Sequence, residues 1–500
     1  MRKIPSSMAT QHPDNASSPY WQKNAFISAA AEIKESYLCF SELDIDEYNW
    51  DWEGKFVDEA VVDRLLHEYF DYFSKFPLGK EKYLTFRIPN PKVEKQYRLA
   101  RSFMVAITNS QLMQSMGFKD HPIFEMILPL TETAEDIIYI QEAFRQLVNI
   151  DHPLLKMKDS IQHIEIIPLI EQVERIFNSG ELIRKYIRLH KKVFGKMPSY
   201  LRPYLARSDH ALNSGLVPTM LAIKVALSEF EKIEKEVDIK LYPMLGTGSL
   251  PFRGSVAPDT IDQAIEEYAG VSTLAVQSGF RYDYPKSLVI KAIQKLKKKL
   301  FRTKAKVLRD NEVELTKKVI PLFERPYKQT VEKLAPLINS WSHEFPKRRE
   351  RMQHIGLFGY SRGVGSAKLP RAIPFTGFLY SIGLPPEIIG TGRGIRKAKK
   401  EKIWQEISHV YKYFRKDIIQ AGCFLNKENV EKLAKEMDVL KDIKEDIKAL
   451  EDALEVELGP KNALHLEHHK LAKKIWLSFK NKKKFSDLIT RGGVIRKSLG

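Results

Sequence analysis

The sequence predicts an α/β protein built on a (β/α)8 barrel, with additional helices that lie mainly toward its C-terminal end. Three observations lead to this prediction. Short apolar runs recur along the chain, each run precedes a segment with helical periodicity, and the runs are apolar on both alternations. Strands covered on both faces have this composition. An open doubly wound sheet is the main structural alternative, because it has the same alternation of strand and helix.

The apolar runs are the candidate strands, which we expect at 84–88, 124–130, 164–170, 200–206, 240–245 and 273–277, with two more near 355–360 and 372–378. Helices are expected between them, and Thr133 and Asp136 have the spacing of a capping box. A long amphipathic helix is expected over 430–454, stopped by Gly459 and Pro460. We therefore divide a single domain into an N-terminal segment (1–80), a barrel (81–400) and a C-terminal helical extension (401–500).

Composition excludes several classes of protein. The chain has 500 residues, 43% of them apolar, which is enough for a large core. It has two cysteines, a polar N-terminus and no run near the roughly 20 apolar residues that cross a membrane. We therefore expect a cytoplasmic protein with no membrane partner.

The net charge of +18 suits an anionic partner, which could be nucleic acid, an anionic membrane surface or a small anionic substrate. The densest basic cluster, 295–306, is interpreted as the solvated face of a helix with Leu296 and Leu300 pointing inward. Because no nucleic-acid motif accompanies it, we expect no nucleic acid as partner. A basic nucleic-acid-binding protein remains the non-enzymatic alternative.

Acidic and basic side chains follow the predicted strands, where a parallel barrel has its active face. Glu171 and Asp209 follow consecutive strands and could hold Mg²⁺ or Mn²⁺, although each could instead cap a helix or pair with an arginine. Arginines near strand ends could bind phosphate or carboxylate, or could form ordinary ion pairs. They are Arg87, Arg253, Arg281, Arg362 and Arg371.

Two further groups of residues have less specific patterns. Gly246, Gly248 and Gly254 belong to a loop, GTGSLPFRG, that is no P-loop but could let backbone N–H groups approach an anion. His12 lies in a predicted turn and by itself reads as a surface residue. The histidines at 465, 468 and 469 lie on a charged helical stretch, where we expect exposure rather than metal binding.

Seven sequence blocks between Ser7 and Phe375 occur together in the order of one family. They are SMATQHPDN, FEMILPLTET, IEIIPLIEQVE, ARSDHALNSG, MLGTGSLPFRG, VQSGFRYDYP and SRGVGSAKLPRAIPF. The set resembles the archaeal-type phosphoenolpyruvate carboxylases. The resemblance implies a barrel of the phosphoenolpyruvate/pyruvate type, Mg²⁺ (or Mn²⁺) and a homotetramer. The implied reaction joins phosphoenolpyruvate and bicarbonate to give oxaloacetate and phosphate, replenishing the tricarboxylic acid cycle. The enzymatic alternative is another barrel lyase or phosphotransferase of the same type.

The resemblance also implies roles for individual residues. His12 matches the catalytic histidine, Glu171 and Asp209 match the metal ligands, and Arg253 matches the arginine of the catalytic loop. Arg362 and Arg371 match the pair that holds substrate phosphate and carboxylate. Gln277 and Arg281 match a further block, expected to bind substrate, whereas Arg87 is assigned by its strand-end position alone.

One position departs from the family pattern. Ser255 follows Gly254 where the family usually has a second glycine. We expect Ser255 to keep a negative φ, and we expect the surrounding loop to act as a mobile lid over the site.

Overall fold

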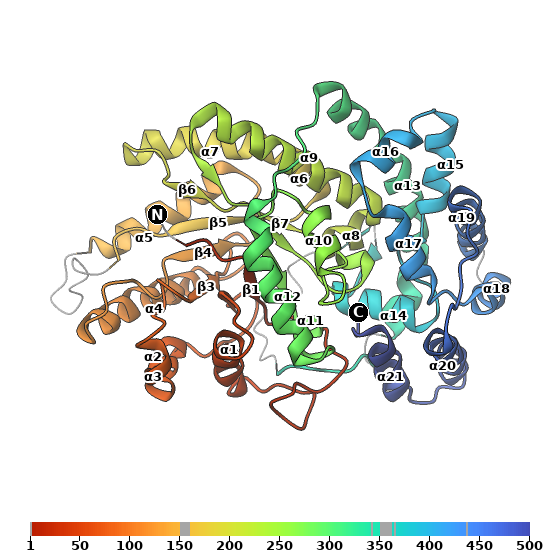
Figure 1. Ribbon diagram of the computed structural model, residues 1–500, viewed down its shortest axis with the longest axis horizontal. Helices are drawn as coiled ribbons and strands as arrows, with labels where there is room; N and C mark the ends of the chain where they lie inside the picture. Colours follow the sequence, from red (N-terminus) through yellow and green to blue (C-terminus); the bar gives the residue numbers. More distant parts are fainter. Residues whose placement is uncertain (1–2, 151–160, 342–343, 351–362, 365–366, 437–438) are drawn as a thin grey trace.

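The computed structural model describes residues 3–150, 161–341, 344–350, 363–364, 367–436 and 439–500. Its parallel strands form a closed barrel, which lies left of the middle in the view of Figure 1. Strand β1 pairs with β10, so Ser7 lies beside Leu274 and closes the barrel. The order around it is β1-β10-β9-β7-β5-β4-β3-β2. The eight strands of the barrel are β1 (Ser7–Ala9), β2 (Glu47–Asp51), β3 (Tyr83–Arg87), β4 (Glu125–Leu128), β5 (Glu165–Ile170), β7 (Tyr204–Ala206), β9 (Met244–Gly246) and β10 (Thr273–Val276). Two small sheets among the described residues pair β6 (Tyr200–Leu201) with β8 (Lys240–Leu241) and β11 (Gly363–Val364) with β12 (Ala367–Lys368). The predicted fold class is confirmed.

Helices between successive strands surround the barrel. They are α1 (Ala31–Ser41), α2 (Val61–Glu68), α4 (Gln96–Ser115), α5 (Ala134–Val148), α7 (Ser179–Phe194), α9 (Leu216–Val237) and α10 (Ile261–Glu267), and α12 (Lys286–Lys299) follows β10. The predicted capping box is present at the start of α5, where the Thr133 side chain accepts from Asp136 N. Leu296 and Leu300 are fully buried, so the basic stretch forms a solvated face at the end of α12 and in the turn that follows it, as predicted.

The later part of the chain forms further helices on one side of the barrel (Figure 1). Helix α13 is the longest and packs against α9 and α15. The others continue the chain to its last residues, and no described helix combines the length and apolarity needed to cross a membrane. These helices are α13 (Asp310–Ser340), α14 (Ala372–Ser381), α15 (Thr391–Lys400), α16 (Trp404–Val410), α17 (Phe414–Gly422), α18 (Lys427–Glu436), α19 (Val439–Leu454), α20 (Ala463–Lys480) and α21 (Ser486–Arg496).

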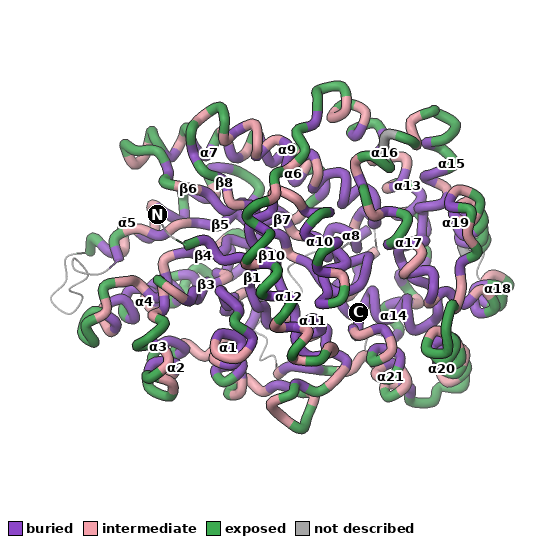
Figure 2. Tube along the Cα trace, viewed as in Figure 1, coloured by how far each residue is buried: buried purple, intermediate pink, exposed green. Residues whose placement is uncertain are grey.

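The barrel interior contains a layer of apolar side chains and, nearer the amino ends of the strands, a cluster of buried ion pairs. The apolar side chains are Met8, Ile127, Ile167, Leu169, Tyr204, Met244 and Ala275. Toward the amino ends of the strands, Arg202 donates to Glu47 and Glu125, and none of the three side chains is more than 2% exposed. Figure 2 shows that burial extends from the strands into the helices around them. The barrel is thus a packed core rather than a channel.

The observed strands differ from the predicted ones where the barrel begins and where it ends in the sequence. The expected strand at 372–378 is wrong, because helix α14 occupies that run, and a short apolar run fits a buried helix equally well. The expected strand at 355–360 lies outside the described residues. Strands β1 and β2 lie instead within 1–80, the segment that we expected to precede the barrel, and β10 ends at Val276.

Two smaller expectations are also corrected. The apolar runs at 200–206 and 240–245 are each interrupted, at Pro203 and Pro243, because proline has no N–H for a strand ladder. His468 was expected to be exposed, but it is 1% exposed and its Nε2 lies 2.6 Å from Arg496 Nη1. Its position on the inner side of α20 explains the burial.

Candidate active site

The predicted site residues meet at the carboxyl ends of the barrel strands. His12, Glu171 and Gln277 follow β1, β5 and β10, whereas Arg87 and Gly246 are the last residues of β3 and β9. Because all of these strands are parallel, the segments after them converge on one end of the barrel. This end faces the later helices and the last residues of the chain (Figure 1).

Arg253 lies at the centre of the site, in a short 3-10 turn, Pro251–Arg253, after β9. Its side chain is 1% exposed, and Nη1 lies 3.2 Å from Asp14 Oδ2. The guanidinium also donates to Gln277 Oε1, to the Gly500 carbonyl oxygen and, at 3.3 Å, to Ser208 Oγ. The structure therefore brings Arg253 and Gln277, both predicted from sequence, into direct contact.

The predicted glycines make room for neighbouring side chains of the same site. A Cβ at Gly248 would lie 2.9 Å from Arg253 Cζ, and one at Gly246 would lie 3.1 Å from the Tyr204 hydroxyl. Gly254 has φ 124°, a conformation that favours glycine. Gly248 thus allows Arg253 to fold back over its own loop, and anion binding by these backbones stays a prediction.

The loop that carries Arg253 is buried and hydrogen-bonded on several sides, and its movement as a lid stays a prediction. Phe252 N donates to Glu387 Oε1 at 2.7 Å, and Phe252 O accepts from Arg207 Nη1 at 2.9 Å. The Tyr268 hydroxyl donates to Gly254 O at 2.9 Å. Each of these side chains is at most 2% exposed. The loop is therefore held within the core between the barrel and the later helices.

The expectation for Ser255 is wrong: its φ is 55°, in the left-handed region. The chain turns sharply after Arg253, and the positive φ of Gly254 continues into Ser255. The Ser255 hydroxyl donates to Asp417 Oδ1 at 2.7 Å, a bond that a second glycine could not make.

His12 is half-buried, and its Nδ1 lies 2.9 Å from Thr10 Oγ1. The segment after it is fixed by α11 (Ser278–Tyr282), because the Asp14 carboxylate accepts from Gly279 N at 2.6 Å and from Ser278 Oγ at 2.9 Å. Asp14 also pairs with Arg253. It therefore links the histidine segment to the arginine loop.

Arg281 lies behind the His12 segment. Its Nη2 donates to Thr10 O at 3.0 Å and to Glu35 Oε1 at 2.9 Å, and Nη1 donates to Val276 O at 2.6 Å. The side chain is fully buried. These contacts position the segment that carries His12, and substrate binding by Arg281 stays a prediction.

Arg87 forms a double hydrogen bond with Asp51, at 2.8 and 2.7 Å, and an ion pair with Glu53 at 2.9 Å. Burial lowers the pKa of Arg87, but Asp51, Glu53 and the nearby Glu171 together hold that pKa well above its usual range. Arg87 is therefore a permanently charged cation at the mouth of the barrel.

Glu171 follows β5, and its Oε2 accepts from Leu130 N at 2.7 Å. Asp209 is in the first turn of α8 (Ser208–Ser214), directly after β7, which pairs with β5. Its side chain lies outside the described part, and no cluster of three or more potential ligands is found among the residues that are described. Two carboxylates at neighbouring strand ends nonetheless fit Mg²⁺, which completes six oxygen sites with water and substrate.

The predicted phosphate and carboxylate pair is only partly described. Arg371 is half-buried and directly precedes helix α14. Arg362 lies outside the described residues, so its pairing with Arg371 stays a prediction.

Sequence reasoning missed several residues that shape the site. Asp14 stands two residues after His12 and Asp51 ends β2, so each could have been found by its place near a motif or strand end. Glu387 and Asp417 had no such signal. They reach the loop from positions 135 and 162 residues away along the chain.

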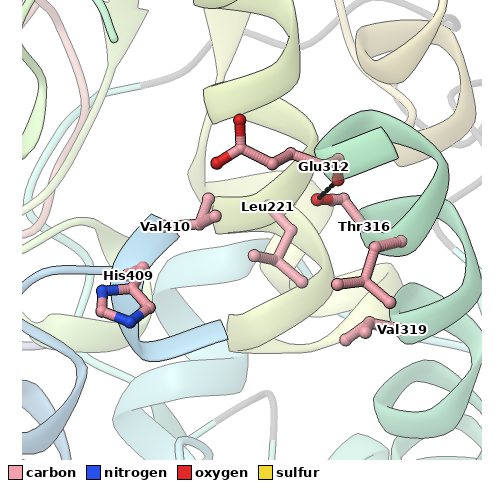
Figure 3. Close-up of a pocket in the computed structure, with 7 residues that line it drawn as sticks. Leu221, Glu312, Thr316, Val319, His409 and Val410 are labelled. Atoms are coloured by element: carbon pink, nitrogen blue, oxygen red, sulfur yellow. Dashed lines mark hydrogen bonds between the residues drawn. The ribbon is translucent and has the colours of Figure 1, made fainter. Parts of the chain in front are cut away.

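One apolar groove lies away from the barrel mouth, between α9, α13 and α16 (Figure 3). The hydrogen bond drawn there joins Thr316 Oγ1 to the Glu312 carbonyl oxygen at 2.7 Å, within α13 itself. Its labelled lining residues are Leu221, Glu312, Thr316, Val319, His409 and Val410. None of these side chains belongs to the site described above.

A parallel barrel with arginine, histidine and carboxylate side chains at its carboxyl mouth has the layout of a (β/α)8-barrel enzyme. A family model described as phosphoenolpyruvate carboxylase matches residues 4–500. The phosphoenolpyruvate carboxylase of Metallosphaera sedula is 38% identical over the full length of both chains. That of Oenococcus oeni is 37% identical over 99% of this chain and 97% of its own, and that of Pyrococcus abyssi is 38% identical over 91% and 94%. The chain belongs to the phosphoenolpyruvate carboxylase family.

Proposed function

We propose that this protein carboxylates phosphoenolpyruvate with bicarbonate, giving oxaloacetate and phosphate, with Mg²⁺ (or Mn²⁺) held by Glu171 and Asp209. The observation that carries the proposal is the ion pair that links the His12 segment to the Arg253 loop at the carboxyl mouth of the barrel. In this pair, Asp14 Oδ2 lies 3.2 Å from Arg253 Nη1. A metal ion held by these two carboxylates would supply Lewis-acid stabilisation of developing negative charge.

The arginines orient the substrate for the first step. Arg362 and Arg371 bind its phosphate and carboxylate, and Arg87 adds positive charge at the mouth. A bicarbonate oxygen attacks phosphorus in line, and the bond from phosphorus to the enol oxygen breaks. The products of this step are carboxyphosphate and the enolate of pyruvate.

His12 acts in the second step. With Nδ1 hydrogen-bonded to Thr10, its Nε2 would accept the carboxyl proton of carboxyphosphate. Carbon dioxide and phosphate then separate, and the enolate carbon attacks carbon dioxide to form oxaloacetate. Arg253 steadies carboxyphosphate, and its burial keeps water from the enolate, which would otherwise be protonated to pyruvate.

Further parts of the proposal follow from family membership rather than from geometry. We expect a homotetramer that acts in the cytoplasm and replenishes four-carbon acids. Sedimentation of the purified protein would test the assembly, since a monomer at enzymatic concentrations is inconsistent with it.

The decisive experiment measures oxaloacetate from phosphoenolpyruvate and Mg²⁺, coupled to malate dehydrogenase, with and without bicarbonate. Bicarbonate-dependent oxaloacetate with stoichiometric phosphate is the expected result. Turnover of phosphoenolpyruvate without bicarbonate would favour another lyase or phosphotransferase of this barrel type. No turnover, together with salt-dependent binding of DNA, would favour the non-enzymatic alternative.

A further inference from the structure

We propose that Asp417, on helix α17, is a positioning residue: through Ser255 it holds the left-handed turn that keeps Arg253 aimed into the barrel mouth. The inference rests on the proposed function, in which Arg253 protects the enolate from protonation. It assigns a role in the reaction to a helix outside the barrel.

The turn after Arg253 has unusual backbone geometry. Gly254 has φ 124° and Ser255 has φ 55°, so two consecutive residues adopt positive φ. Glycine does this without steric penalty, whereas serine carries a Cβ that disfavours the left-handed region. A serine at this position therefore needs a specific contact to hold it.

Asp417 provides that contact from within the core. Its Oδ1 accepts from Ser255 Oγ at 2.7 Å, and the side chain of Gln263 approaches the same oxygen at 3.3 Å. The Tyr411 hydroxyl donates to Oδ2 at 2.5 Å, which fixes the orientation of the carboxyl group. Asp417 is 4% exposed, so water does not compete for these bonds.

Ser255 is coupled to Arg253 by a shared acceptor. The Leu250 carbonyl oxygen accepts from Arg253 N at 2.9 Å and from Ser255 N at 3.1 Å. In addition, Gly248 N donates to Arg253 O at 2.8 Å, which closes the loop upon itself. A change of φ at Ser255 would therefore move the backbone of Arg253 and tilt its guanidinium away from Gln277.

The electrostatics agree with a role beyond packing. Burial, helped by the nearby carboxyl of Glu267, raises the pKa of Asp417 to about 6, against the lowering effects of Tyr411, Ser255 and Arg207. Because its pKa is raised, ionised Asp417 lowers the stability of the folded protein at neutral pH, and a neutral side chain would not. This loss of stability is explained if the carboxylate is needed as a strong acceptor for the loop.

The test compares Asp417→Asn, Ser255→Ala and Ser255→Gly in full-length enzyme, by the ratio of pyruvate to oxaloacetate formed per phosphate released. This ratio is independent of the fraction of folded enzyme. Loss of a hydrogen bond to a charged group predicts a rise of about tenfold in the ratio for Ser255→Ala. Asp417→Asn keeps an amide oxygen as acceptor but loses the charge, so it should raise the ratio in the same direction by less. Ser255→Gly restores the turn without the bond, so its ratio should stay within about threefold of wild type.

The matched control is Asp446→Asn, a buried carboxylate on α19 that accepts from Gly390 N at 2.8 Å and does not contact the loop. It should lower stability and leave the ratio unchanged. In the Ser255→Gly background, Asp417→Asn should have little further effect on the ratio. Unchanged ratios in both Asp417→Asn and Ser255→Ala would overturn the positioning role. Wild-type enzyme that forms no oxaloacetate would instead overturn the proposed function.

Discussion

Glu35 offers a quantitative test of how the His12 segment is held. This carboxylate is fully buried and meets Arg349 through two bonds, at 2.7 and 2.6 Å, and Arg281 through one at 2.9 Å. The hydroxyls of Tyr48 and Tyr282 donate to it as well. Burial alone raises the pKa of Glu35, but the two arginines outweigh it and lower that pKa from 4.5 to about 2.

The pKa shift gives the expected magnitude. A carboxyl whose folded pKa is depressed adds stability above its unfolded pKa, and that stability is lost as pH falls toward the folded pKa. The fall from 4.5 to about 2 corresponds to about 3 kcal/mol at neutral pH. Removing one partner of a buried ion pair costs about 3 to 5 kcal/mol, which agrees in size. Glu35→Gln should therefore lower the free energy of unfolding by at least about 3 kcal/mol at pH 7.

Urea unfolding at a series of pH values measures the effect. The difference between wild type and Glu35→Gln should be largest above about pH 4.5 and should shrink as the pH falls below it. Glu59→Gln is the control, because Glu59 pairs at the surface with Arg101, which is 51% exposed, and should change stability by less than about 1 kcal/mol. A Glu35→Gln difference as small as that of the control, or one independent of pH, would refute the reasoning.

Three further outcomes are expected. His12→Asn should keep bicarbonate-dependent phosphate release but lose oxaloacetate by about 100-fold or more, measured in the coupled assay; full oxaloacetate production would remove His12 from the mechanism. Asp209→Ala should raise the Mg²⁺ concentration for half-maximal rate by about tenfold or more, and an unchanged metal titration would show that it is no ligand. Arg202→Met leaves Glu47 and Glu125 buried without their cation, so urea unfolding should show a loss of about 3 to 5 kcal/mol with kcat nearly unchanged. A loss below about 1 kcal/mol would contradict that account.

The fold could be predicted because parallel strands covered on both faces have a simple composition. The run at 164–170 is nearly continuously apolar and is a strand. The run at 84–88, in which Thr85 and Arg87 alternate with apolar residues, is a strand as well. Strands β1 and β2 were not predicted. Strand β1, Ser7–Ala9, has only three residues, which are too few to show a pattern, and β2, Glu47–Asp51, has polar residues at both ends. Only closure of the barrel, through pairing of β1 with β10, reveals their place.

The site residues could be predicted where reactive or charged side chains stand directly after a predicted strand. Arg253 and Gln277 stand in recognisable blocks, and the structure joins them. The support behind them was not predictable, because Asp417 and Glu387 act through contacts that only the packing of distant helices creates. The left-handed Ser255 shows the same limit, since its φ depends on a partner 162 residues away.

The His12 segment and the Arg253 loop are held by buried carboxyl groups whose pKa values are shifted in opposite directions. Glu35 meets guanidinium groups, so its ionised form stabilises the His12 segment throughout the neutral range. Burial instead raises the pKa of Glu387, which accepts from Phe252 N, to about 7 and that of Asp417 to about 6. Their protonated forms favour the folded state, so their contribution to global stability is present at low pH and is lost as pH rises through these values. The carboxyls that hold the Arg253 loop thus change charge near neutrality, where ionisation strengthens them as acceptors at a cost in global stability, whereas the carboxylate behind the His12 segment stays ionised until the medium is acidic.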